Sequence, residues 1–96
     1  MQFIIRALDG EGVLDKRMEV RPRHLAGMEK MQDRVICAGG LLDEDGKMKG
    51  SVLVVDFPDR AAVDAYLAEE PYVVEHVWEK IDVERFNAVI VGGAKQ

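Results

Sequence analysis

Cysteine and long apolar runs are scarce in this sequence. Cys37 is the one cysteine among 96 residues, which excludes an intramolecular disulfide and a zinc site built from several cysteines. The apolar run that precedes Arg6 is too short for the core of a signal peptide or for a membrane span. We therefore expect a cytoplasmic protein without a membrane partner.

Positive charge is also scarce. The chain has 13 Lys and Arg against 18 Asp and Glu, a formal net charge of −5, which argues against a nucleic-acid partner because such partners need a clustered basic surface. One local exception is the group Arg17, Arg21 and Arg23 beside His24. Two interpretations of it stay open, a solvated helix entrance or the rim of a pocket that attracts anions.

The chain contains no linker-like stretch, internal repeat or low-complexity segment that would divide it. Its length is typical of one domain, and a chain of this size with 48% hydrophobic residues can bury a core without disulfides or metals. We expect a single domain over residues 1–96.

The first half of the sequence predicts a strand, a loop, a helix and two more strands. Residues 2–8 alternate as a buried strand does, and the polar, glycine-containing segment 9–20 indicates a loop. Pro22 suits a first helical turn, so we expect a helix from Pro22 to about Arg34. Strands are predicted over 36–42 and 51–57, joined as a hairpin by the turn dipeptide Asp45-Gly46.

The second half predicts a helix and a last strand. Asp59 after Pro58 is a plausible N-cap, and the helix should end before Glu70-Pro71, because a residue preceding proline disfavours helical geometry. A final strand is expected within 78–91, with a break in its alternation between residues 84 and 86. His76 lies among valines, and we expect it at the edge of the core.

The resulting order βαββαβ predicts an α+β fold of the ferredoxin-like type, an antiparallel sheet with both helices on one face. The other face of the sheet would then expose more apolar surface than a monomer usually tolerates. We expect this open face to pair with a second copy of the chain, giving a homodimer.

Two histidines and a pair of acidic residues are the candidates for chemistry. His24 is suited to proton transfer near neutral pH if a carboxylate accompanies it, although a surface or structural role is the more common one for a histidine at a helix start. The pair Glu69-Glu70 is by default solvated charge. The histidines and acids show no compact ligand spacing, and no phosphate loop, nucleophile elbow or dinucleotide fingerprint occurs, so we expect neither metal nor cofactor.

Several short motifs, in order and over nearly the whole chain, resemble the YciI-related (YCII) family. They are Arg21-Pro22-Arg23-His24-Leu25, Ala38-Gly39-Gly40-Leu41, Asp45-Gly46 with Gly50-Ser51, and Glu70-Pro71-Tyr72. The resemblance implies a ferredoxin-like subunit of a dimeric α+β barrel with a pocket between helices and sheet. It further implies an enzyme with a histidine and an aspartate at that pocket, in a family whose members mostly have no assigned reaction.

Carried onto this sequence, the family histidine falls on His24 and the family aspartate on Glu70, whose carboxylate reaches one methylene further. Gly40 stands where the family often has proline. The resemblance thus implies a catalytic pair of His24 and Glu70, and it leaves open whether the longer carboxylate still meets the histidine.

Two functions follow as hypotheses. The first is a cofactor-independent enzyme, for example a lyase or isomerase, that acts on a polar small molecule with His24 as general acid or base and Glu70 orienting it. Arg21 or Arg23 would attract an anionic or enol-like group, and Ser51 and Tyr72 would donate hydrogen bonds. The second is a non-catalytic module of the same fold that binds a small ligand or another protein, which the change from aspartate to Glu70 slightly favours.

Overall fold

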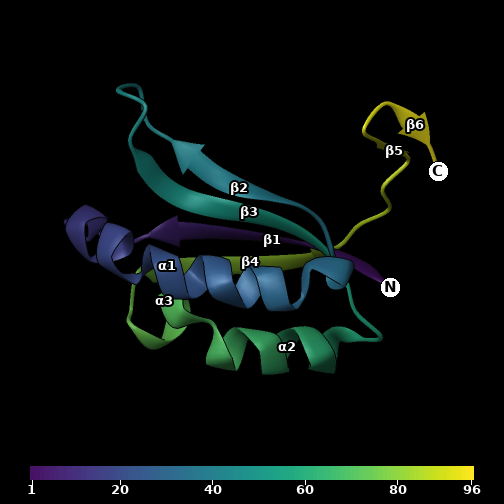
Figure 1. Ribbon diagram of the computed structural model, residues 1–96, viewed down its shortest axis with the longest axis horizontal. Helices are drawn as coiled ribbons and strands as arrows, with labels where there is room; N and C mark the ends of the chain where they lie inside the picture. The colour runs from purple at the N-terminus through teal and green to yellow at the C-terminus, as the bar shows by residue number, and fades with distance from the viewer.

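The computed structural model describes all 96 residues. The chain forms one layer of sheet and one layer of helices (Figure 1). In chain order the elements are β1 (Gln2–Asp9), α1 (Leu14–Lys30), a 3₁₀ turn (Gln32–Arg34), β2 (Val35–Leu42), β3 (Met48–Asp56), α2 (Arg60–Glu69), α3 (Pro71–Val74), β4 (Trp78–Arg85), β5 (Ile90–Val91) and β6 (Ala94–Lys95).

The four long strands form an antiparallel sheet in the order β2-β3-β1-β4. All helices lie on one side of it, below the sheet as drawn in Figure 1. The register places Ile5 of β1 opposite Leu53 of β3 and opposite Val83 of β4. The predicted α+β, ferredoxin-like arrangement is therefore confirmed.

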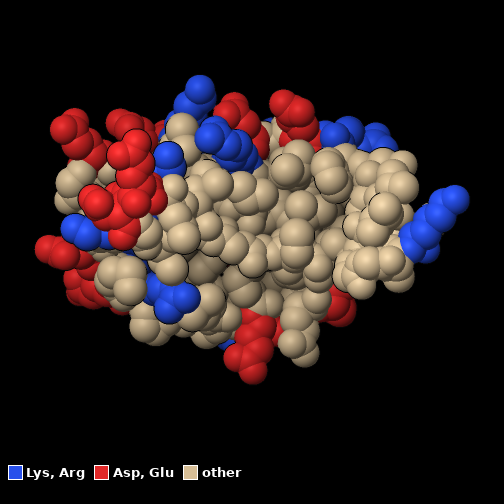
Figure 2. Space-filling model, turned by 90° about the horizontal axis from the view of Figure 1, so that it is seen from above, with Lys and Arg blue, Asp and Glu red and all other residues tan.

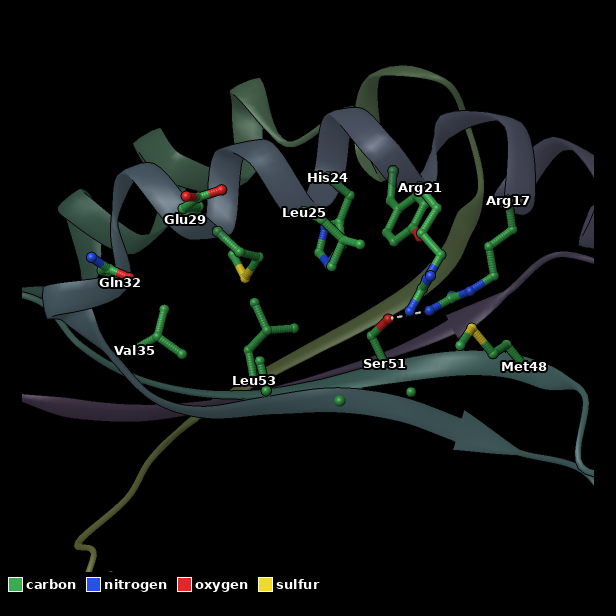
Figure 3. A pocket seen from close by; sticks show the side chains of 15 residues that line it. Arg17, Arg21, His24, Leu25, Glu29, Gln32, Val35, Met48, Ser51 and Leu53 are labelled. Carbon is green, nitrogen blue, oxygen red and sulfur yellow. Dashed lines mark hydrogen bonds between the residues drawn. The ribbon is translucent and has the colours of Figure 1, made fainter.

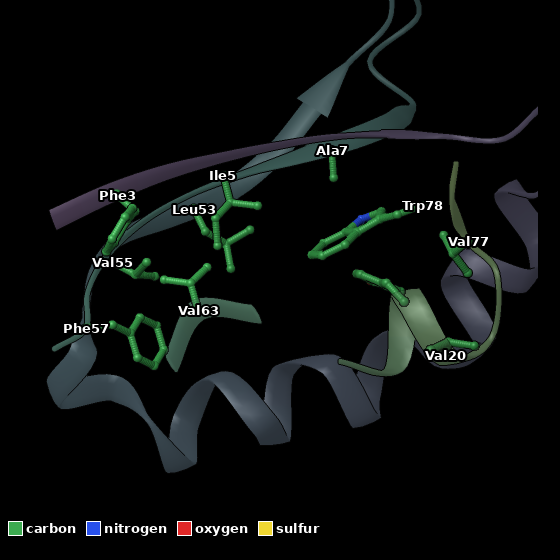
Figure 4. Packing of buried hydrophobic residues seen from close by; sticks show 11 residues of the cluster. Phe3, Ile5, Ala7, Val20, Leu53, Val55, Phe57, Val63, Val77 and Trp78 are labelled. Atoms are coloured by element: carbon green, nitrogen blue, oxygen red, sulfur yellow. The ribbon is translucent and has the colours of Figure 1, made fainter. Parts of the chain in front are cut away.

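The core lies between the helices and the covered face of the sheet (Figure 4). Every second residue of β1 and β3 points into it, because side chains alternate between the two faces of a strand. The buried cluster consists of Phe3, Ile5, Ala7, Val20, Leu53, Val55, Phe57, Val63, Tyr72, Val77 and Trp78. Trp78 is the one tryptophan of the chain, and its ring centroid lies 6.0 Å from that of His24.

The structure confirms the predicted hairpin turn at Gly46 and the predicted N-cap at Asp59. The β2–β3 hairpin turns at Gly46, whose φ of +79° lies in the region that favours glycine. Asp59 caps α2, since its carboxylate accepts a hydrogen bond of 2.8 Å from the backbone N–H of Ala62.

The predicted start of the first helix was wrong. α1 begins at Leu14, so most of the expected loop is helical and Pro22 lies inside the helix. The inner face of the added turns carries the buried Arg17 as well as Val20. A buried charge interrupts the apolar pattern from which an amphipathic helix is predicted, and for that reason the segment resembles a loop in sequence.

Further differences concern the C-terminal half. Pro71 opens the short helix α3, and β4 ends at Arg85, where the alternation breaks. The residues beyond it form the small β5–β6 hairpin. His76 is exposed rather than placed at the core edge, and its φ of +59° belongs to the turn after α3.

No helix covers the face of the sheet opposite α1, α2 and α3 (Figure 1). Figure 2 shows it as a broad uncharged area with charges gathered mainly around its margin. By register, Ile4 and Leu8 of β1 and Val52 and Val54 of β3 point to this side. No helix is long and apolar enough to cross a membrane.

Candidate functional site

A cavity of about 470 Å³ opens between α1 and the covered face of β2 and β3 (Figure 3). α1 lines it with residues three or four apart, which lie on one helix face. Its polar lining groups include Arg17, Arg21, His24, Ser51 and Tyr72. A cavity of this size holds a small organic molecule.

His24 and Glu70 meet beside this cavity. The two residues are 46 positions apart, and His24 Nδ1 lies 2.7 Å from Glu70 Oε1. The side chains are 10% and 1% exposed. A carboxylate can only accept, so an ionised Glu70 requires the hydrogen of this bond on Nδ1 and leaves Nε2 as the basic nitrogen of the neutral ring.

The carboxylate of Glu70 is itself held by two more donors. Its Oε1 accepts from the backbone N–H of Tyr72 at 3.2 Å, and its Oε2 accepts a short hydrogen bond from the Tyr66 hydroxyl. Glu70 thereby caps α3. Burial, with the charge and hydrogen bond of Glu70, raises the pKa of Tyr66, which keeps this hydroxyl a donor. The longer side chain of Glu70 is fixed at both oxygens.

Two aromatic rings hold the imidazole in place. The Tyr72 ring stacks on His24 with centroids 4.2 Å apart and planes 22° apart, and Trp78 meets the imidazole edge-on at 6.0 Å. Together with Glu70 they leave the ring little freedom, and such preorganisation is what an acid or base in a site requires.

A buried ion pair supports the other end of the cavity. Arg17 Nη1 donates to Asp9 Oδ1 at 2.8 Å, and Nη2 donates to Ser51 Oγ at 2.8 Å. The Arg17 guanidinium also lies 4.6 Å from the centroid of the Tyr72 ring. Burial raises the pKa of Asp9, although the neighbouring Arg17 acts in the opposite direction.

The structure brings together most of the predicted site residues. His24, Arg21, Ser51 and Tyr72 all line the cavity, and Glu70 joins them through His24. Ser51 is engaged by Arg17, and Tyr72 stacks on the imidazole with its own hydroxyl buried and unpaired.

Arg23 is the predicted site residue that lies elsewhere. Its side chain is 60% exposed and sits 3.5 Å from Glu75. It lines a separate hollow between α1 and α2, which also reaches Tyr66 and Glu70.

Sequence reasoning left Arg17 open as part of a possible pocket rim without naming it a site residue, and it missed Asp9 and Tyr66. Arg17, Arg21 and Leu25 follow one another at spacings of four, the period of a helix face. That spacing was the available signal for Arg17. Tyr66 likewise precedes Glu70 by four residues.

Comparison with protein families gives a match to the YCII-related domain over residues 1–87. The chain belongs to the YCII-related family. A relative named protein YciI from Escherichia coli is 32% identical over 93% of this chain and 99% of its own length. A protein from the aspercryptin biosynthesis cluster of Emericella nidulans is 28% identical over 81% of this chain and 56% of its own length.

Among solved structures, this YCII-related chain is similar to 5-chloro-2-hydroxyhydroquinone dehydrochlorinase from Burkholderia phenoliruptrix, in complex with 2,5-dihydroxybenzoquinone. The TM-score is 0.85, with 25% identity over 91% of this chain and 94% of that one. A second similar structure, a protein from Bacteroides thetaiotaomicron described as an antibiotic biosynthesis monooxygenase, has a TM-score of 0.60 at 12% identity, covers 100% of this chain and 95% of its own, and shares the fold.

Proposed function

We propose that this protein is a small cofactor-independent enzyme that moves a proton on a polar small molecule, with His24 as general base and then general acid. The observation that carries the proposal is the buried contact of 2.7 Å between His24 Nδ1 and Glu70 Oε1 at the cavity. Glu70 orients the ring and stabilises the imidazolium that forms when Nε2 accepts a proton. The single exposed cysteine suits a reducing, cytoplasmic location.

Similarity to a solved enzyme supports an enzyme over a passive binding module. The dehydrochlorinase, 25% identical to this chain, acts on a hydroxylated ring and was solved with a planar dihydroxyquinone. A proton transfer at a planar, enol-like molecule is within reach of a histidine whose ring is fixed as His24 is.

The tautomer of His24 tests the pairing without a substrate. In ¹⁵N-labelled protein above neutral pH, we expect the neutral His24 ring to carry its proton on Nδ1, because Glu70 is the acceptor there. Glu70→Leu removes the acceptor at similar size, and the proton should then populate Nε2. Tyr66→Phe is the matched control, since it removes a different contact of the same carboxylate and should leave Nδ1 protonated. A wild-type ring protonated on Nε2 would contradict the role given to Glu70.

We also propose that the open face of the sheet pairs with a second copy. Large apolar side chains remain exposed near it in the C-terminal segment, with Phe86 at 41%, Val89 at 53% and Ile90 at 67%. Sedimentation equilibrium at micromolar concentration should give twice the 10.7 kDa chain mass. Val52→Lys, which places a charge on the open face, should yield the monomer. A wild-type monomer at that concentration would rule this pairing out.

A further inference from the structure

The cavity has a positive end and a negative end. Figure 3 shows Arg17 and Arg21 gathered with Ser51 at one end, Glu29 and Gln32 at the other, and His24 between them. The gradient follows from α1, because Arg17 and Arg21 lie one turn apart and Glu29 lines the cavity two turns further along the helix. A bound molecule therefore meets a charge of different sign at each end.

The two guanidinium groups are not equivalent. Arg17 is 3% exposed and is neutralised by Asp9. Arg21 is half-buried, lines the cavity and has no carboxylate within 4 Å. Burial keeps the neighbouring Tyr72 protonated by raising its pKa, so this phenol does not neutralise Arg21. One positive charge at this end is left without a partner in the chain.

The rest of the cavity has apolar walls and a floor without a side chain at Gly40. Gly40 of β2 lies opposite Ser51 in the register, so it faces the helices and forms part of the cavity floor. A Cβ built on Gly40 would lie in van der Waals contact with Met48 Cγ, at 3.4 Å, so the absence of a side chain at Gly40 leaves room in the cavity beside Met48. Leu25 and Leu53 provide apolar walls.

We propose that Arg21 binds an anionic oxygen carried on an sp² carbon, so that the substrate is a small planar acid or enol. Arg17, held by Asp9 and Ser51, lines the same end of the cavity. A cation that is half desolvated and unpaired favours such an oxygen, and a planar guanidinium matches a planar oxyanion.

The catalytic role of Arg21 rests on the proposed function, in which His24 transfers the proton. Arg21 and His24 are three residues apart, which places them one above the other on α1. His24 Nε2 would take a proton from a carbon next to the substrate carbonyl. The C–H electron pair then forms a carbon–carbon double bond, and the carbonyl π pair moves onto oxygen. Arg21 stabilises the negative charge that develops on this oxygen.

Binding of benzoate, 4-nitrophenolate and the neutral isostere benzamide tests the inference by titration calorimetry. We expect at least one anion to bind the wild type more tightly than benzamide. Arg21→Gln should weaken that anion roughly 10- to 100-fold and leave benzamide unchanged, as expected for a lost hydrogen bond to a charged group. Arg23→Gln is the matched control on the same helix, outside the cavity, and should change neither affinity. The anion that binds more tightly shows whether the site prefers a carboxylate or an enolate-like oxygen.

Several outcomes would overturn the inference. These are anion binding that survives Arg21→Gln, anions bound no better than benzamide, and no anion bound at all. Benzoate has no hydrogen on the carbon next to its carboxylate, so its binding reports on Arg21 apart from catalysis. If anion binding depends on Arg21 but the protein transfers no proton, this inference stands and the proposed enzyme is refuted. If the protein transfers a proton but anion binding does not depend on Arg21, only this inference is refuted.

Discussion

Replacing Asp9 by alanine should lower the free energy of unfolding by about 3 to 5 kcal/mol, the largest stability effect that we expect from a single side chain. Asp9 and Arg17 are 5% and 3% exposed, and the Asp9 carboxylate is the only anion within 4 Å of the guanidinium. Without Asp9 the charge of Arg17 stays buried with Ser51 as its one remaining hydrogen-bond partner. Urea denaturation monitored by Trp78 fluorescence measures the loss.

Two controls separate a buried-charge effect from the loss of any ion pair. Asp64→Ala removes the partner of Arg60 in an exposed pair, where the Arg60 and Asp64 side chains are 56% and 59% exposed, and should cost less than about 1 kcal/mol. The double variant Asp9→Leu with Arg17→Met removes both buried charges and should recover much of the stability. A cost for Asp9→Ala as small as that for Asp64→Ala would show that Arg17 is not desolvated as described.

The same ion pair explains where sequence reasoning failed on the fold. The strands, the Gly46 turn and the Asp59 cap follow from alternation and local hydrogen bonding, which short stretches of sequence contain. The start of α1 depends on Arg17 being buried, and that burial depends on Asp9 at the end of β1. A charged side chain on an inner helix face cannot be predicted from periodicity without knowledge of its partner.

The candidate site could likewise be predicted from the sequence only in part. The contact of His24 with Glu70 joins residues 46 positions apart, and the sequence pointed to it only through the family resemblance. With a helix that begins at Pro22, the sequence does not show which of Arg21 and Arg23 faces the cavity. Once α1 begins at Leu14, the four-residue spacing from Arg17 to Arg21 places Arg21 on the cavity face and leaves Arg23 outside.

Replacing His24 by asparagine should reduce catalysed proton transfer by about 10² to 10⁴-fold, the typical contribution of a general acid or base. Asparagine retains a hydrogen-bonding side chain toward Glu70 and lacks a nitrogen that takes up a proton near neutral pH. The assay is the exchange of carbon-bound hydrogen for deuterium in small planar keto and enol acids in D₂O, followed by proton NMR, and it requires no knowledge of the final product.

A comparison with Glu70→Gln separates the reacting group from the group that positions it. The amide oxygen of the introduced glutamine can still accept a hydrogen bond from Nδ1, but the side chain lacks the negative charge that stabilises the imidazolium. Exchange should therefore fall less steeply than in His24→Asn, and its pH profile should change. Trp78 fluorescence and urea denaturation check that both variants fold. If His24→Asn is folded and exchanges as fast as the wild type, the proton is taken by another group and His24 is structural. If neither wild type nor variant exchanges any acid that binds at the cavity, the carboxylate–imidazole pair serves ligand binding instead.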